Sequence, residues 1–198
     1  MASSTIIPIT STKPVKVMVS RYESNEWKVE ICCVISNHEK FEDIANRFGV
    51  PFHYFPIKKD TKKQMEAEEL ALLKKLNVEL IILARYMQIL SDDFCSHFPN
   101  KIINIHHSSL PAFAGARPYE SAHRRGVKFM GATAHYVTAD LDEGPIITQD
   151  VIHISHRDSI GDMKRKGRNI EKIVLANACW AHLNHKVLSF NNKTVVFD

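Results

Sequence analysis

A nearly continuous apolar run decides the fold class of this chain: Val78-Glu79-Leu80-Ile81-Ile82-Leu83-Ala84. Central strands of parallel sheets carry such runs because helices bury both of their faces. Predicted helices flank the run, one from Asp60 to about Leu76 and one that Ser91 caps. Strands that alternate with helices predict an α/β protein with a Rossmann-like, open, mostly parallel sheet and helices on both faces.

The elements downstream continue this alternation. Apolar and alternating patterns predict strands over residues 131–138 and 145–154 and a long helix from 158 or 159 to about 185. Two short β-like runs about Asn191-Asn192 predict a C-terminal hairpin. With 198 residues, the chain is long enough for one core, so we predict one catalytic domain over residues 15–198.

Composition limits the partners and the compartment. The apolar share of 44%, the charged share of 24% and the net charge of +4 are ordinary for a globular protein and a weak argument for nucleic acid. No apolar run approaches the ~20 residues of a membrane span. The four cysteines have no C-x-x-C spacing, which argues against a disulfide framework and a zinc site. We therefore expect an intracellular protein that binds neither nucleic acid nor membrane.

The N-terminal region conflicts with a regular α/β fold. Residues 1–14 are rich in Ser and Thr and predict a disordered leader, which leaves mitochondrion and cytoplasm both open. Val15–Ser20 and Trp27–Ser36 predict strands, with only six residues between them. A parallel crossover needs ~10–12 residues, so the first crossover helix is expected to be missing. That loss would uncover a sheet face, which a homo-oligomer would cover.

Polar side chains gather where the predicted strand after Lys101 ends, in Asn104-Ile105-His106-His107. Side chains on a strand repeat with period two, so Asn104 and His106 share a face. An amide and an imidazolium together can stabilise a carbonyl oxygen that becomes negative. Asp142, beside Gly144 and Pro145, is the candidate carboxylate to orient the imidazole. The alternatives are a structural histidine and an ordinary loop aspartate.

Other chemistry finds less support in the sequence. Adjacent histidines on a strand point to opposite faces, and no H-E-x-x-H spacing occurs, so no metal site is predicted. Ser108 and Ser109 lack a G-x-S-x-G elbow and are expected to bond the local backbone. Residues 84–90 are read equally well as a core turn and as the apolar wall of a pocket for a flat heterocycle.

Several ordered motifs resemble the catalytic domain of the 10-formyltetrahydrofolate deformylase family, within the folate-dependent formyltransferase superfamily. The resemblance runs from about Val29 to the C-terminus. The motifs that carry it are Leu83-Ala84-Arg85-Tyr86-Met87-Gln88-Ile89-Leu90-Ser91, Asn104-Ile105-His106-His107-Ser108, Leu110-Pro111-Ala112-Phe113, Gly115-Ala116-Arg117-Pro118-Tyr119, Gly131-Ala132-Thr133-Ala134-His135-Tyr136-Val137 and Leu141-Asp142-Glu143-Gly144-Pro145-Ile146-Ile147.

The resemblance implies a hydrolase that converts 10-formyltetrahydrofolate and water to formate and tetrahydrofolate, in one-carbon metabolism supporting purine synthesis and glycine balance. It implies no metal and no cofactor, since the folate is the substrate. Asn104, His106 and Asp142 match the family's catalytic triad. The residues that match the folate pocket are Met87, Gln88, Ile89, Leu90, Thr138, Ala139, Asp140 and Leu141.

Two alternatives stay open beside hydrolysis. A related formyltransferase would pass the formyl group to an amine, but its Gly/Ser-rich phosphate loop is replaced here by Ser20-Arg21-Tyr22-Glu23, without glycine, and His107 stands in place of its common proline. A truncated, non-catalytic folate-binding relative is suggested by the expected loss of the crossover helix. The regulatory ACT-type domain of full-length deformylases is also expected to be absent.

Overall fold

The chain folds into two compact units in the computed structural model. It describes residues 3–8, 12–58, 60–84, 86, 88–111 and 118–197. The first unit comprises residues 1–104 and 137–143, and the second comprises residues 105–136 and 144–198.

The first unit is built on a parallel sheet in the order β3-β2-β1-β4-β5. The order reverses between β1 and β4, which is the arrangement of a Rossmann-like sheet. The α/β class with a mostly parallel sheet is therefore confirmed. The strands are β1 Ser3–Pro8, β2 Val29–Ser36, β3 Phe52–Tyr54, β4 Leu80–Leu83 and β5 Ile102–His106, whose last two residues belong to the second unit.

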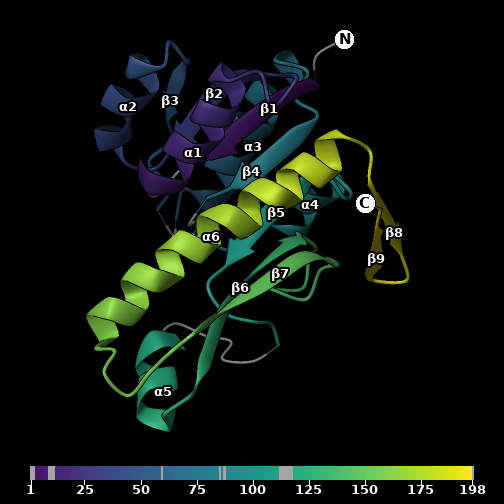
Figure 1. The fold of residues 1–198 in the computed structure, drawn as a ribbon. Helices are drawn as coiled ribbons and strands as arrows, with labels where there is room; N and C mark the ends of the chain where they lie inside the picture. The colour runs from purple at the N-terminus through teal and green to yellow at the C-terminus, as the bar shows by residue number, and fades with distance from the viewer. Residues whose placement is uncertain are drawn as a thin grey trace. The chain divides into compact units, whose positions relative to one another are not determined.

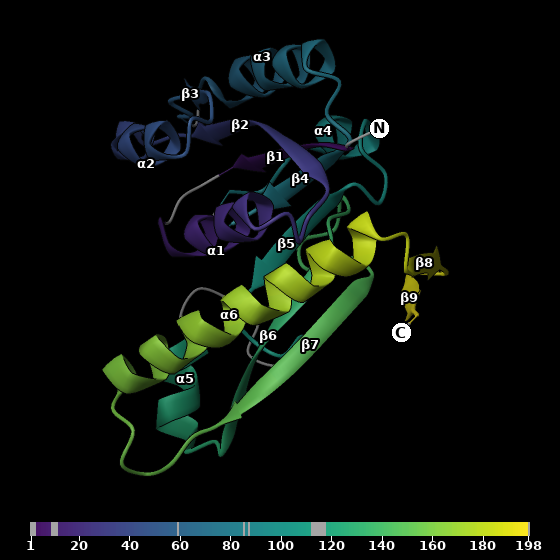
Figure 2. The ribbon, with the colours of Figure 1, turned by 45° about the horizontal axis from the view of Figure 1, so that its top comes forward.

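Helices cover both faces of this sheet, as predicted. Figure 2 shows α3 on one side of strands β2 and β1 and α1 on the other. The strand β4 lies in the core between them, with all four residues buried. The helices of this unit are α1 Thr12–Glu23, the 3₁₀ turn η1 Glu39–Phe41 with α2 Glu42–Arg47, α3 Lys62–Lys75 and α4 Asp92–Ser96.

The predictions for the N-terminal region are wrong. Ser3–Pro8 is strand β1, paired in parallel with β2, and not part of a disordered leader, so the domain does not start at residue 15. Val15–Ser20 lies inside helix α1, which is the crossover helix expected to be missing. Its alternating valines favour a strand locally, but Met18 and Val19 are both 1% exposed as part of a helix that joins two parallel strands. Tertiary context overrides such weak local preferences.

Two inferences change with this correction. Helix α1 is present between β1 and β2, so the reason given for a homo-oligomer or a crippled relative is removed. Ser20-Arg21-Tyr22-Glu23 lies in α1 and its C-terminal end and does not follow the first strand. The stretch after β1 is Ile9-Thr10-Ser11, which lies outside the described residues and also contains no glycine.

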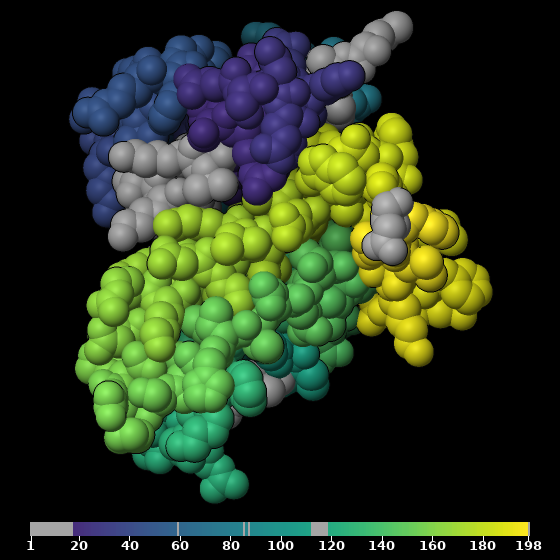
Figure 3. Space-filling model, in the orientation of Figure 1, coloured from purple at the N-terminus to yellow at the C-terminus, as the bar shows by residue number. Residues whose placement is uncertain are grey.

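The second unit consists of an antiparallel pair, two helices and the C-terminal hairpin (Figure 1). The long helix α6 packs against both β6 and β7. The predicted hairpin is confirmed: Asn191 and Asn192 form its turn with φ of 46° and 57°, as turns with two left-handed residues require. Figure 3 shows this hairpin at the molecular surface. The elements are α5 Pro118–Arg125, β6 Phe129–Tyr136, β7 Ile146–His153, α6 Ile160–Leu183, β8 Val187–Phe190 and β9 Lys193–Val196.

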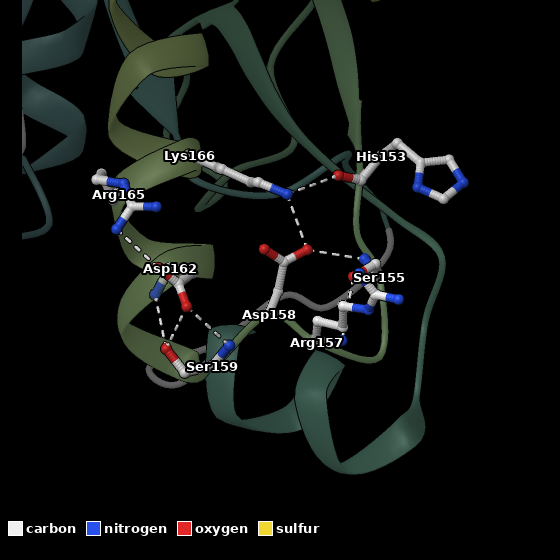
Figure 4. Close-up of polar contacts among 8 residues, drawn as sticks. All are labelled: His153, Ser155, Arg157, Asp158, Ser159, Asp162, Arg165 and Lys166. Carbon is white, nitrogen blue, oxygen red and sulfur yellow. Dashed lines mark hydrogen bonds and ion pairs between the residues drawn. The ribbon is translucent and has the colours of Figure 1, made fainter.

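A capping box starts α6 (Figure 4). The Ser159 hydroxyl oxygen accepts from the Asp162 backbone N–H at 3.1 Å, and the Asp162 carboxylate accepts from the Ser159 N–H at 3.1 Å. The hydrogen bond from the Ser159 side chain holds the pKa of Asp162 below its ordinary value. Nearby, Lys166 donates to Asp158 at 2.8 Å and likewise lowers the pKa of that carboxyl.

Among the described helices, none is long and apolar enough to cross a bilayer.

We expect Ser159→Ala to lower the free energy of unfolding by about 1 kcal/mol, because the first turn of α6 loses its side-chain acceptor. For a chain of this size that corresponds to a fall of roughly 2–4 °C in the melting temperature, measured by calorimetry. Ser159→Thr keeps the hydroxyl and serves as the matched control. An alanine variant as stable as the wild type would show that the box does not stabilise the helix.

Candidate active site

The end of strand β5 carries the first two candidate residues. Asn104 and His106 are two positions apart on this strand, so their side chains leave it on the same face, as predicted. Asn104 is half-buried, and His106 is 6% exposed. The amide and the imidazole therefore stand at the C-terminal end of a parallel strand, where ligands bind in open α/β sheets.

The loop that carries Asp142 is fixed to the same strand within the first unit. The Val137 N–H donates to the Ile102 carbonyl oxygen at 2.9 Å, two residues before Asn104. The Cys95 thiol, on α4, donates to the Thr138 carbonyl oxygen at 3.8 Å. Asp142 is half-buried and has φ of 58°, a left-handed conformation that aspartate tolerates better than most residues. The carboxylate is thus on a loop held from two sides.

The predicted folate-binding segments share a core with that loop. Leu90 is 6% exposed and belongs to the cluster that contains Ile102 and contacts Val137. Ile89 and Leu141 are instead 53% and 59% exposed, so each segment presents one aliphatic side chain to solvent. Gln88 and Thr138 are half-buried, and Ala139 and Asp140 are exposed, whereas Met87 lies outside the described residues. Exposed aliphatic side chains on anchored loops suit contact with a flat heterocycle.

Two buried carboxyl groups support the segment before α4, and sequence reasoning missed them. Glu66 and Glu69, both on α3, are each 5% exposed. The Glu66 carboxylate accepts the Ser91 backbone N–H at 3.2 Å, and the Ser91 hydroxyl caps α4 as predicted. The i, i+3 spacing of the two glutamates could have indicated that they form a pair, because it places them on one face of the helix.

Burial changes the acid–base behaviour of this cluster. Desolvation, with the nearby Glu66 carboxyl, raises the pKa of Glu69 to about 7. Burial also raises the pKa of Tyr86, whose hydroxyl has no hydrogen-bond partner among the described residues. Glu69, in the cluster that supports the segment before α4, therefore changes its charge near neutral pH.

In the second unit, the loop after His106 is pinned by one buried threonine. The Thr133 hydroxyl donates to the Ser108 carbonyl oxygen at 2.8 Å and accepts the Leu110 N–H at 3.0 Å. The Gln149 amide donates to the Leu110 carbonyl oxygen and to the Thr133 hydroxyl, at 3.0 and 2.8 Å. A Cβ at Gly131 would lie 2.0 Å from the Ser109 hydroxyl oxygen, so only glycine admits the loop this close. Residues 108–110 are therefore held against β6 and β7.

Two expectations about this loop differ from the structure. The Ser108 hydroxyl is buried without a hydrogen-bond partner among the described residues, and so does not bond the local backbone. The rings of His106 and His107 stack at 5.1 Å instead of pointing to opposite faces, because β5 ends at His106. In the described part of the chain, no three His, Cys, Asp or Glu side chains are grouped to hold a metal ion.

Comparison with known proteins identifies the family of the chain. Residues 5–179 match the family described as formyl transferase, so the chain belongs to the formyl transferase family.

Its relatives include formyltetrahydrofolate deformylases and a transformylase. The chain is 56% identical over 177 residues to the formyltetrahydrofolate deformylase of Synechocystis sp., covering 89% of this chain and 62% of that protein. The crystal structure of a formyltetrahydrofolate deformylase from Pseudomonas syringae superposes with a TM-score of 0.96 at 44% identity, over 100% of this chain and 66% of that one. The crystal structure of a glycinamide ribonucleotide transformylase from Symbiobacterium toebii superposes with a TM-score of 0.92 at 26% identity. The match covers 100% of this chain and 95% of that one. The chain spans about six tenths of the length of the curated relatives that it matches.

Glu69→Gln tests the buried carboxyl cluster. A carboxyl with a pKa of about 7 when folded and 4.5 when unfolded stabilises the protonated fold, and this contribution is lost as the pH rises from about 4.5 to 7. Above pH 7 the ionised group costs roughly 3 kcal/mol, which glutamine avoids. We expect the variant to melt several degrees higher than the wild type at pH 8 and at nearly the same temperature at pH 5, in thermal denaturation scans.

Glu68→Gln is the matched control, since Glu68 is the exposed neighbour on the same helix. It should change the melting temperature little at either pH. An equal stabilisation by Glu69→Gln at both pH values would contradict the shifted ionisation.

Proposed function

We propose that the chain hydrolyses 10-formyltetrahydrofolate to formate and tetrahydrofolate, within one-carbon folate metabolism. The observation that carries the proposal is the pair Asn104 and His106 at the end of β5, with the Asp142 loop hydrogen-bonded to the same strand. The 56% identity to a formyltetrahydrofolate deformylase supports this reaction over others of the family.

In the proposed mechanism, a water molecule adds to the formyl carbon. The carbonyl oxygen becomes negative, and the Asn104 amide and the His106 imidazolium donate hydrogen bonds to it. The ionised Asp142 carboxylate orients His106, favours its cationic form and takes the proton of the attacking water. The protonated Asp142 carboxyl then gives this proton to N10 as the bond from the formyl carbon to N10 breaks, and the product leaves as formate after losing its own proton to solvent. Side chains supply this chemistry, without a metal or another cofactor.

The folate would lie against the two segments that the first unit anchors. Backbone groups of residues 87–90 and 138–142 would hydrogen-bond the pterin-like ring, and exposed Ile89 and Leu141 would contact its faces. Because Leu90 and Val137 pack on one core cluster, both segments are held in place before the ligand arrives. Such preorganisation lowers the cost of binding.

Formyl transfer to an amine is the second candidate. It is supported by the TM-score of 0.92 to a glycinamide ribonucleotide transformylase, of which the chain covers 95%. The identity to that protein is 26%, against 56% to the Synechocystis deformylase. The absence of glycine from Ile9-Thr10-Ser11 also argues against a phosphate-binding loop after the first strand.

The two candidates are separated by incubating the purified chain with 10-formyltetrahydrofolate, with and without amine acceptors, and measuring formate and tetrahydrofolate. We expect formate without an acceptor. Asp142→Asn should lower kcat roughly 10²–10⁴-fold, because the general base is lost while the left-handed backbone is tolerated.

Glu143→Gln, the next residue of the same loop, is the matched control and should keep near-normal kcat. Tetrahydrofolate that forms only when an amine is present would establish transfer instead. Tight folate binding by folded protein without any turnover would leave a non-catalytic binding protein.

A further inference from the structure

A stack of three rings stands behind the candidate catalytic histidine. The rings of His106 and His107 lie 5.1 Å apart between centroids, with 13° between their planes. The rings of His107 and Tyr119 lie 6.0 Å apart, at 10°. Both spacings fall within the ~4.5–7 Å range of favourable aromatic pairs. The middle ring, His107, is thus nearly parallel to the rings of both of its neighbours.

Tyr119 is fixed at the far end of this stack. Its hydroxyl donates to the Glu171 carboxylate at 2.8 Å, and the two side chains are 6% and 3% exposed. Tyr119 also packs in a core cluster of the second unit, which contains Ala122 and Met163. The hydrogen bond restrains the Tyr119 hydroxyl, and packing restrains its ring.

Gly167 makes room for the tyrosine. A Cβ at this position would lie 2.2 Å from the Tyr119 hydroxyl oxygen and 2.7 Å from Cε1 of the ring. Gly167 is one helical turn before Glu171 on α6, so the missing side chain and the hydrogen-bond acceptor share one face. Helix α6 thus supplies both a slot for the ring and an anchor for its hydroxyl, at the energetic cost of a glycine in a helix.

We infer that His107 and Tyr119 are positioning residues for His106, held in register by Glu171 of α6 through the Tyr119 hydroxyl. The inference rests on the proposed function, in which His106 donates to the developing oxyanion. A ring stacked on His106 restricts its rotation without using either of its nitrogen atoms. Misplacing a catalytic group by about 1 Å can cost roughly 10²-fold in rate.

Two substitutions at His107 separate stacking from other roles. His107→Phe keeps a flat ring, and His107→Leu keeps a similar apolar bulk without one. We expect the leucine variant to lose roughly 10- to 100-fold in kcat with little change in KM, and the phenylalanine variant to stay within about threefold of wild type. His153→Leu is the matched control, since it removes another histidine with an aromatic contact, an edge-on one to Phe129, in the same unit.

The anchor is tested by Tyr119→Phe and Gly167→Ala. The phenylalanine variant keeps the ring and loses the bond to Glu171, whereas the alanine variant displaces the ring itself. We expect a small loss of kcat from the first and a loss close to that of His107→Leu from the second. Melting temperatures identify any variant whose activity falls because it does not fold.

A spectroscopic measurement makes the inference independent of turnover. In NMR spectra of the whole chain, stacking should shift the ring protons of His106 upfield. We expect this shift to be lost in His107→Leu and kept in His107→Phe. An unchanged His106 signal in the leucine variant, or equal kcat losses in both His107 variants, would overturn the inference. A wild-type chain that releases no formate would refute the proposed function, and the NMR comparison would still decide the stack.

Discussion

One backbone hydrogen bond, from the Val137 N–H to the Ile102 carbonyl oxygen, fixes the relation between the acid loop and the strand that carries Asn104. Loops that bear functional groups gain accuracy when rigid elements hold them. Here the support is strand β5 of the parallel sheet, and Ile102 is fully buried. The loop that carries Asp142 and the residue Asn104 are thus both positioned by strand β5.

The same core serves the segment after β4. Leu90, Ile102 and Phe94 belong to one cluster, against which Val137 packs. A cavity in that cluster would affect both candidate binding segments at once, because close-packed interiors transmit strain. Glu66 adds a polar tie to the Ser91 backbone from α3. The two loops of the first unit are therefore held by one core cluster. Their positions depend on packing in that cluster more than on the composition of the loops.

Much of this arrangement could be predicted, because it depends on local patterns. The buried run at β4, the Asn104–His106 spacing and the Asn191-Asn192 turn each favour one local structure, and the rest of the chain agrees with it. The region around Val15–Ser20 could not, since alternating valines favour a strand until the chain is required to cross between parallel strands. The burial of Glu66 and Glu69 also escaped prediction, because charged residues normally mark the solvent face of a helix. The ring stack on His106 depends on where β5 ends and on a glycine far along the chain.

The thiol that holds Thr138 has a consequence for oxidative damage. Burial raises the pKa of Cys95, so the group stays protonated at neutral pH and keeps the hydrogen that it donates to the carbonyl oxygen. The thiolate, and not the thiol, is the nucleophile that attacks peroxides and disulfides, so such reagents react slowly with a protonated group. The acid loop is therefore tied down by a sulfur atom that common cellular oxidants will largely spare.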